Sequence, residues 1–289
     1  MMTSLRKFTR AWLLLLVFVA VSGCALLEEV AQPRTPELQV VGQRLVGLSL
    51  EQVELEMDFA IFNPNAFSIP VGALDYQLDI QGQQLLRGQQ RQGFNLRSGE
   101  KAEVTLPITL EFSQLAALVG NLAGTHELAY RFAGGMSFDL PLLGSQRAPI
   151  ETRGSFPVPA LPEIQVAGLK AQELSLASAG LLLELKLTNP NVFDLNMTRF
   201  DYGLNLEGNQ VVGGGLASGL HLPAGEEVTL ALPFSVRLLD LGRSGFAALT
   251  QAAEINYSLN FSSGFASGLE ALGSLEYASE QQGKIRLQR

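Results

Sequence analysis

One long segment occurs twice in this chain. Residues 36–115 align with residues 162–241 at a constant shift of 126, without a gap, and 26 of the 80 aligned pairs are identical. A repeat as long as a domain indicates two copies of one fold rather than a solenoid of short units. The total length of 289 residues also fits two domains. Residues shared by the copies are therefore expected to serve their common architecture.

The shared residues that most constrain this architecture lie at strand ends, at turns and within one long strand. In the first copy they are Asn63, Pro64, Asn65, Asp75, Tyr76, Gly82 and Pro107, and in the second copy they are Asn189, Pro190, Asn191, Asp201, Tyr202, Gly208 and Pro233.

Polar and apolar residues alternate just before each Asn-Pro-Asn motif. In the first copy, apolar side chains occupy every second position from Val53 to Ile61, with mainly acidic residues between them. The second copy repeats the pattern from Leu181 to Leu187. A period of two predicts a half-buried β-strand in each copy.

Each Asn-Pro-Asn motif is expected to end its strand. The residue before a proline is held extended, the proline has no N–H for a sheet ladder, and asparagine readily forms turns. A structural role as strand terminator is therefore favoured. The alternative is that the asparagine amides contact a ligand.

Glycine and proline mark further turns and edges. Gly82 and Gly208 lie where a tight hairpin turn is expected, and Gly208-Asn209 suits a primed turn. Pro107 and Pro233 interrupt a long alternating segment, which places that strand at the edge of a sheet. Short helices are predicted at 113–122 and 239–253.

Each copy therefore holds about seven or eight short strands and one small helix. This pattern predicts two tandem β-sandwiches of the immunoglobulin or fibronectin III type. A proline-rich stretch at 156–162 predicts an extended, semi-rigid linker. The expected domains are residues 36–158 and 162–289.

The N-terminus has the organisation of a secretion signal. Three basic residues precede the apolar run 11–21, which is too short to span a bilayer as a helix. Ser22 and Gly23 follow, and the next residue is Cys24, the single cysteine of the chain. An ordinary signal peptide followed by an incidental cysteine is the alternative interpretation.

The segment Val21-Ser22-Gly23-Cys24 resembles the bacterial lipoprotein signal. The resemblance implies that residues 1–23 are removed, that Cys24 is lipidated and that residues 24–35 form a tether. The membrane is then the expected partner, through the acyl chains. Ala25 after the cysteine implies the outer membrane, facing the periplasm, if the host is Gram-negative.

The charge of the chain argues against nucleic acid as a partner. Removal of residues 1–23 takes three of the 20 basic residues and none of the 28 acidic ones, which leaves a formal net charge of −11. Nucleic-acid binding relies on lysine and arginine contacts to phosphates. An acidic chain is also a poor ligand for anionic lipid surfaces.

No catalytic or metal-binding motif is recognisable, so neither an enzyme nor a cofactor is expected. The two histidines, His126 and His221, do not correspond under the repeat and lack ligand spacing. Residues 213–215 are three glycines, which predict a flexible turn rather than a phosphate loop. Glu54, Glu56 and Asp58 share one strand face, where a solvated surface is favoured over a divalent-cation site.

The two Asn-Pro-Asn strands, the Asp-Tyr strands, the glycine hairpins and the proline-containing edge strands together resemble the LEA type 2 family, whose unit is also called the WHy (water stress and hypersensitive response) domain. The resemblance implies a seven-stranded β-sandwich with a small helix and a link to desiccation or other stress. It implies no active-site residues. Two alternatives stay open: binding of lipid or another apolar ligand in the cell envelope, and a scaffold that docks envelope proteins.

Overall fold

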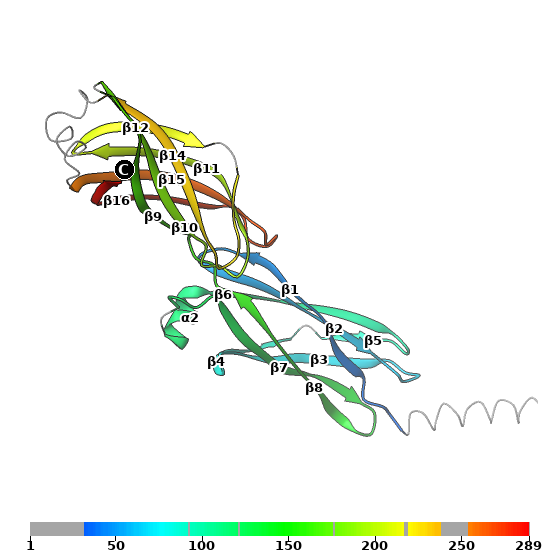
Figure 1. Ribbon diagram of the computed structural model, residues 1–289. Helices are drawn as coiled ribbons and strands as arrows, with labels where there is room; N and C mark the ends of the chain where they lie inside the picture. The colour runs from blue at the N-terminus through cyan, green and yellow to red at the C-terminus, as the bar shows by residue number, and fades with distance from the viewer. Residues whose placement is uncertain are drawn as a thin grey trace, which may run out of the picture. The chain divides into compact units, whose positions relative to one another are not determined.

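The computed structural model describes residues 32–91, 93–120, 122–175, 177–216, 219–237 and 254–288. The expected signal peptide, the Cys24 lipidation site and the first part of the tether lie outside the described residues. The second expected helix, at 239–253, also lies outside them. Nearly all of the described chain is β-strand (Figure 1).

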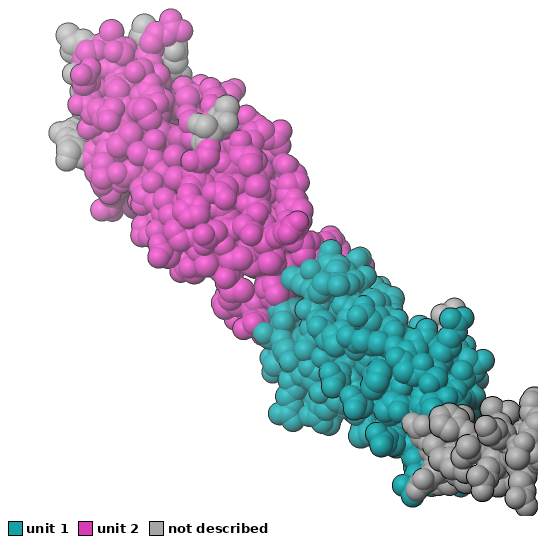
Figure 2. Space-filling model, turned by 90° about the vertical axis from the view of Figure 1, so that its right-hand side faces the viewer, with its two compact units in different colours: residues 1–46, 53–121, 129–156 teal, residues 47–52, 122–128, 157–289 magenta. Residues whose placement is uncertain are grey.

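The chain divides into two compact units (Figure 2). Unit 1 comprises residues 1–46, 53–121 and 129–156, and unit 2 comprises residues 47–52, 122–128 and 157–289. Each unit has its own set of buried apolar side chains.

Unit 1 is a sandwich of two β-sheets. Its strands are β1 (Glu37–Leu48), β2 (Gln52–Phe62), β3 (Ile69–Ile80), β4 (Gln83–Gln90), β5 (Phe94–Leu96), β6 (Lys101–Glu111), β7 (Glu127–Leu140) and β8 (Gly144–Pro157). One sheet has the order β1-β2-β6, and the other has the order β4-β3-β7-β8, with β5 also paired to β3. The rings of Phe59 on β2 and Phe132 on β7 lie 5.6 Å apart, so the two sheets pack through their inner faces.

Unit 2 repeats this arrangement strand for strand. Its strands are β9 (Glu163–Leu174), β10 (Ser178–Thr188), β11 (Leu195–Leu206), β12 (Asn209–Leu216), β13 (Leu220–Leu222), β14 (Glu227–Arg237), β15 (Glu254–Ser267) and β16 (Leu275–Gln288). The order is β9-β10-β14 in one layer and β12-β11-β15-β16 in the other. The two layers are joined at one corner, where the end of β16 pairs with β9 in parallel through Leu287–Leu169 and Gln288–Lys170.

The alternation in the sequence becomes the core of each sandwich. Every apolar residue at alternate positions from Val53 to Ile61 is at most 4% exposed, and those from Leu181 to Leu187 are at most 1% exposed. A period of two places these side chains on one face of β2 or β10, where burial of each contributes roughly 1.5–3 kcal/mol. The prediction of half-buried strands is confirmed.

Both β3–β4 and β11–β12 are hairpins closed by two left-handed residues. In the first turn φ is 50° at Gln81 and 79° at Gly82, and in the second it is 48° at Glu207 and 79° at Gly208. A primed hairpin turn needs positive φ at both central positions. The expected pair Gly208-Asn209 is therefore wrong by one residue, because Asn209 already begins β12.

The mid-strand prolines lie on edge strands. Pro107 is in β6 and Pro233 is in β14, and each of these strands ends its three-stranded layer. On an edge strand a proline removes no ladder hydrogen bond if its nitrogen faces away from the neighbour.

The composition of residues 213–215 predicted a flexible turn, and this prediction is wrong. These glycines lie within β12 and pair with residues 201–203 of β11. A Cβ on Gly214 would come within 3.4 Å of the Tyr202 hydroxyl, and one on Gly215 within 2.6 Å of an Asp201 carboxylate oxygen. The close approach of Asp201 leaves little room for a side chain at position 215.

A single short helix, α2 (Phe112–Val119), occurs in the described residues. It starts one residue before the predicted position and ends at Gly120, which has φ of 92°. Phe112 and Leu115 are its buried side chains. None of the described residues belongs to a helix long and apolar enough to cross a membrane.

Candidate functional site

Asn63 is buried at the end of β2 and is fully engaged by the protein itself. Its side-chain Nδ2 donates to the carbonyl oxygens of Phe67 at 2.8 Å, Leu96 at 3.1 Å and Arg97 at 2.9 Å. Its Oδ1 accepts from the backbone and side-chain nitrogens of Asn65, both at 3.0 Å. One side chain thus joins the end of β2 to β5 and to the chain beyond β5.

Asn65 holds the segment that leads into β1. Its Oδ1 accepts from the Arg34 N–H and its Nδ2 donates to the Arg34 carbonyl, both at 2.8 Å. Such a two-point contact to the backbone of one residue fixes where the chain enters the sandwich. The backbone carbonyl of Asn65 accepts a further hydrogen bond from Ser98 Oγ at 2.9 Å.

Unit 2 makes the same contacts at positions shifted by 126. Asn189 Nδ2 donates to the carbonyls of Phe193, Leu222 and Pro223 at 2.9–3.2 Å. Asn191 pairs with Ala160 through both backbone groups of that residue, at 2.8 and 2.9 Å. Because all four asparagines are at most 2% exposed and bonded internally, their amides are not available to a ligand.

Asp75 and Tyr76 are adjacent on β3 but face opposite sides of the sheet. The Tyr76 ring stacks on Phe132 at 6.0 Å and covers Gly88, where a Cβ would lie 2.5 Å from the tyrosine oxygen. Asp75 faces outward and accepts from Arg147 Nε at 2.9 Å and Nη2 at 2.6 Å. Tyr76 therefore belongs to the packing, whereas Asp75 belongs to the outer surface.

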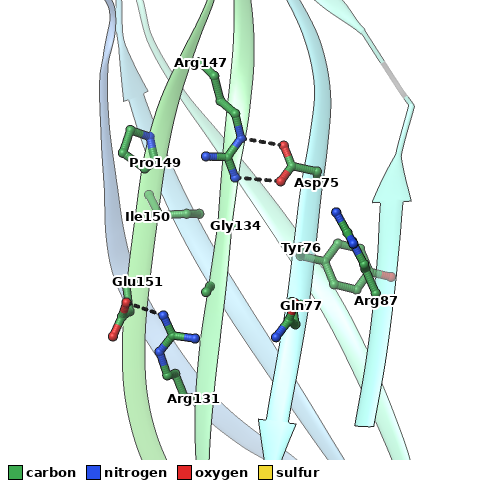
Figure 3. Close-up of a pocket in the computed structure, with 11 residues that line it drawn as sticks. Asp75, Tyr76, Gln77, Arg87, Arg131, Gly134, Arg147, Pro149, Ile150 and Glu151 are labelled. Atoms are coloured by element: carbon green, nitrogen blue, oxygen red, sulfur yellow. Dashed lines mark hydrogen bonds and ion pairs between the residues drawn. The ribbon is translucent and has the colours of Figure 1, made fainter. Parts of the chain in front are cut away.

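The outer surface around Asp75 is a shallow hollow with three arginines (Figure 3). The hollow has a volume of about 500 Å³, and Ala133 and Gly134 of β7 lie among its lining residues. Arg87 comes from β4, Arg131 from β7 and Arg147 from β8. Strand β4 and the later, consecutive strands β7 and β8 thus bring their guanidinium groups to one face.

Carboxylates hold two of these guanidiniums in place. Arg131 donates from Nη1 to Asp79 at 3.1 Å and from Nη2 to Glu151 at 2.6 Å. The bonds from Arg131, and next those from Arg153, lower the pKa of Glu151 from 4.5 to about 2. The hydrogen bonds from Arg147 lower the pKa of Asp75, and the charge of Arg87 acts in the same direction.

The acidic face of β2 is occupied by an arginine. Arg44 contacts Glu56 at 2.5 Å and Asp58 at 2.9 Å, and Thr105 Oγ1 donates to Asp58 at 2.7 Å. The residues that the structure describes contain no group of three or more His, Cys, Asp or Glu side chains able to hold a metal ion. His221 lies beside Asn196, at 2.9 Å, and Asp194, at 3.6 Å.

A second hollow of about 450 Å³ opens between the two layers of unit 1. It is lined by Leu74 of β3, Met136 of β7, Phe94 of β5 and Val104 of β6. Gln90 also lines it, and the side-chain oxygen of Gln90 is buried without a hydrogen-bond partner among the described residues.

Sequence reasoning did not single out the arginine hollow. Positions 87, 131 and 147 are not neighbours in sequence and carry no recognisable motif. One signal was present: Arg87 aligns with Gly213, so the copies differ there in charge although their folds agree.

Comparison with known proteins places both copies in one family. The family model for late embryogenesis abundant proteins, LEA_2, matches residues 58–154 and 184–269. The chain is 25% identical over 137 residues to the late embryogenesis abundant protein Lea14-A of Gossypium hirsutum, covering 47% of this chain and 91% of that protein. It is equally identical, with the same coverage, to the desiccation-related protein PCC27-45 of Craterostigma plantagineum.

A comparison of structures also finds a protein of Arabidopsis thaliana, whose solution structure is 22% identical to this chain. The match covers 45% of this chain and 86% of that protein, with a TM-score of 0.37.

Proposed function

Because this chain belongs to the LEA type 2 family of late embryogenesis abundant proteins, we propose that it is a non-catalytic lipoprotein that protects the cell envelope during desiccation or osmotic stress. The observation that carries the proposal is that both copies match the family, while the curated relatives that they match are named for late embryogenesis or desiccation. The internal use of the shared asparagines supports a role for these residues in shape rather than in chemistry.

The proposal places the protein on the envelope through lipidated Cys24, in the outer membrane and facing the periplasm if the host is Gram-negative. The N-terminal sequence motivates this location, since a positive region, an apolar run and two small residues precede the cysteine. Cells labelled with radioactive palmitate should yield a labelled protein in the membrane fraction. The Cys24→Ala variant should lose both the label and the membrane association; retention of both would exclude lipidation at this residue.

Protection is tested by drying. A deletion strain should survive desiccation less well than the wild type, and expression of the chain from a plasmid should restore survival. The Cys24→Ala variant separates the two parts of the proposal: it should remain folded but fail to restore survival if anchoring is required. Equal survival of the deletion strain and the wild type, together with no recovery of a dried test enzyme by the purified protein, would contradict a protective role.

A second candidate function, binding of an apolar ligand, is favoured by the hollow between the layers of unit 1. Leu74 and Met136 are each 2% exposed there, and the buried oxygen of Gln90 needs a donor. The ligand chemistry that fits is a neutral, hydroxyl- or amide-bearing chain, because the Glu103 carboxylate also lines the hollow and would repel an anionic head group.

Native mass spectrometry of the detergent-extracted protein tests this candidate. A bound neutral lipid should be detected in the wild type and lost in the Leu74→Phe variant, because phenylalanine occupies the equivalent position 200 in unit 2 and would fill the hollow. Phe200→Leu in unit 2 is the matched control for the substitution itself. A protein that carries no lipid under conditions where a known lipid carrier stays loaded would rule out this function.

A further inference from the structure

The outer faces of the two sandwiches differ in charge although their strands correspond. In unit 2 the arginines are replaced by small uncharged residues or by an acidic one. Arg87 aligns with Gly213. Arg131 lies opposite Asp79, and Ser258 lies opposite the equivalent residue Asn205. Gly154 of β8 and Gly283 of β16 each lie against the equivalent tyrosine, Tyr130 or Tyr257, so Glu276 takes the place of Arg147. The hollow on that face of unit 2 is lined by Asp201 and Glu280, together with polar and aromatic residues. Three guanidiniums are thus a property of unit 1 alone.

The carboxylates orient the arginines without using all of their donors. A guanidinium carries five N–H donors. Arg147 places Nε and Nη2 on Asp75, which leaves Nη1 outside that fork. Arg131 uses Nη1 and Nη2 on two acids, which leaves Nε. Both side chains are therefore held in fixed positions, with further donors beside the same hollow.

Arg87 differs from the other two arginines. It is exposed on β4, next to the hollow, and its guanidinium makes no hydrogen bond or ion pair with the described residues. Its charge acts on Asp75 from a distance, since it helps to lower the pKa of that carboxyl group. In Figure 3 it lies on the strand beside β3, on the side opposite Arg147. A ligand in the hollow would thus meet oriented donors from one side and a free guanidinium from the other.

We propose that this arginine hollow, defined by Arg87, Arg131 and Arg147, binds the oxyanion of a phosphate ester. A tetrahedral phosphate accepts hydrogen bonds in several directions at once, whereas a planar carboxylate is satisfied by a single fork. Donors that converge from three strands suit the phosphate. Arg153 adds a fourth guanidinium through its contact with Glu151, and four guanidiniums against the three carboxylates Asp75, Asp79 and Glu151 leave the hollow locally positive on a chain of net charge −8. The inference is independent of the protective role proposed above.

Arginine side-chain NMR tests this site in the full chain. The protein, labelled with ¹⁵N-arginine and held in detergent micelles, is titrated with potassium phosphate and, separately, with glycerol 1-phosphate at constant ionic strength. The Nε–H signals of the three arginines should shift in a saturable way, and more weakly at high salt. The Arg87→Gln variant should bind about tenfold more weakly, because it loses the one guanidinium that has no internal partner.

A third arm separates a soluble phosphate from a lipid head group. The same spectra are recorded in bicelles of phosphatidylcholine with and without phosphatidylglycerol. Shifts with both soluble phosphates identify a small soluble ligand, and shifts with phosphatidylglycerol alone identify a lipid head group; either result supports the site. The matched control is Arg199 on β11 of unit 2, which contacts Asp201 and Glu276 and should not respond.

Two results would overturn the proposal. One is the absence of a saturable shift in every arm. The other is an equal response of Arg199, or an unchanged affinity of the Arg87→Gln variant. Either would mean that the signal shifts report a general effect of the added anions rather than binding at this hollow. Because the Arg87 side chain is exposed and its guanidinium has no partner among the described residues, its substitution is expected to leave the fold intact, as the remaining signals of the spectrum will report.

Discussion

The two units keep the same buried hydrogen bonds but carry different outer surfaces. Asn63 and Asn189 each donate to three backbone carbonyls at equivalent positions, with distances that agree within about 0.3 Å. On the outer face, by contrast, Arg87 corresponds to Gly213. A buried donor without an acceptor is costly, whereas an exposed side chain is replaced at little cost. The comparison separates residues that the fold requires from residues that are free to acquire a function.

The largest effect is expected from the asparagine contacts. Asn63→Ala removes the side chain that joins β2 to β5 and leaves buried carbonyls without donors, so unit 1 should lose about 3 kcal/mol of its unfolding free energy. Asn189→Ala should destabilise unit 2 by the same amount. Native-state hydrogen exchange resolves the two units. The exposed Asn95 supplies a control whose change to alanine should cost less than about 0.5 kcal/mol. If only one of the two substitutions destabilised its own unit, the equivalence would be contradicted.

A smaller effect is expected at the hairpin turns. Alanine at Gly82 or Gly208 must adopt φ of 79°, where its Cβ meets no other atom within 4 Å, so only the backbone conformation is penalised. Each substitution should lower the stability of its unit by about 1 kcal/mol. Gly219→Ala is the control, because φ at Gly219 is not left-handed and a Cβ there would meet no other atom within 4 Å. Urea unfolding followed by amide signals from each unit provides the measurement, and unequal losses at the two turns would break the comparison.

The smallest effect concerns pH and should be larger in unit 1 than in unit 2. The pKa of Glu151 is lowered from 4.5 to about 2 by Arg131 and then Arg153. A lowered folded-state pKa contributes stability that is present above pH 4.5 and is lost as pH falls toward 2. The stability difference between wild type and Glu151→Gln should therefore vanish over this range.

Unit 2 offers the control for the pH effect. Glu280 stands at the position of Glu151 and accepts hydrogen bonds from Ser258 and Gln282 rather than from arginines, so the Glu280→Gln variant should lose less stability than Glu151→Gln. Urea titrations at pH 6, 4 and 2, read separately in the two units, measure both variants. A wild-type advantage that persists at pH 2 would show that Glu151 acts through packing rather than through its charge.

Much of the fold was predictable because it rests on local patterns. A period of two from Val53 to Ile61 specified a strand and its buried face, since successive side chains point to opposite sides. The turn at Gly82 and the edge position of Pro107 followed from backbone sterics and a missing N–H. The glycines at 213–215 misled, because they lie within a paired strand, and the pairing with β11 is not visible in a local run of glycines.

The arginine hollow was not predictable in the same way. Arg87, Arg131 and Arg147 come from strands β4, β7 and β8, and only the pairing of these strands around β3 brings them together. Exposed charged residues follow no period that distinguishes a binding face from a solvated one. Comparison of the copies is the one sequence signal, because the arginine at 87 is lost at 213 while the flanking fold residues are kept.

The amino-acid sequence by itself determined two copies of one all-β unit, the residues buried in each and the places where strands end, because these depend on interactions between near neighbours along the chain. The tertiary structure alone decided which outward side chains share a face, how two carboxylates orient two arginines and why a third is left without a partner in the described chain. Those relations depend on strand order and register, which bring together residues up to about 70 positions apart.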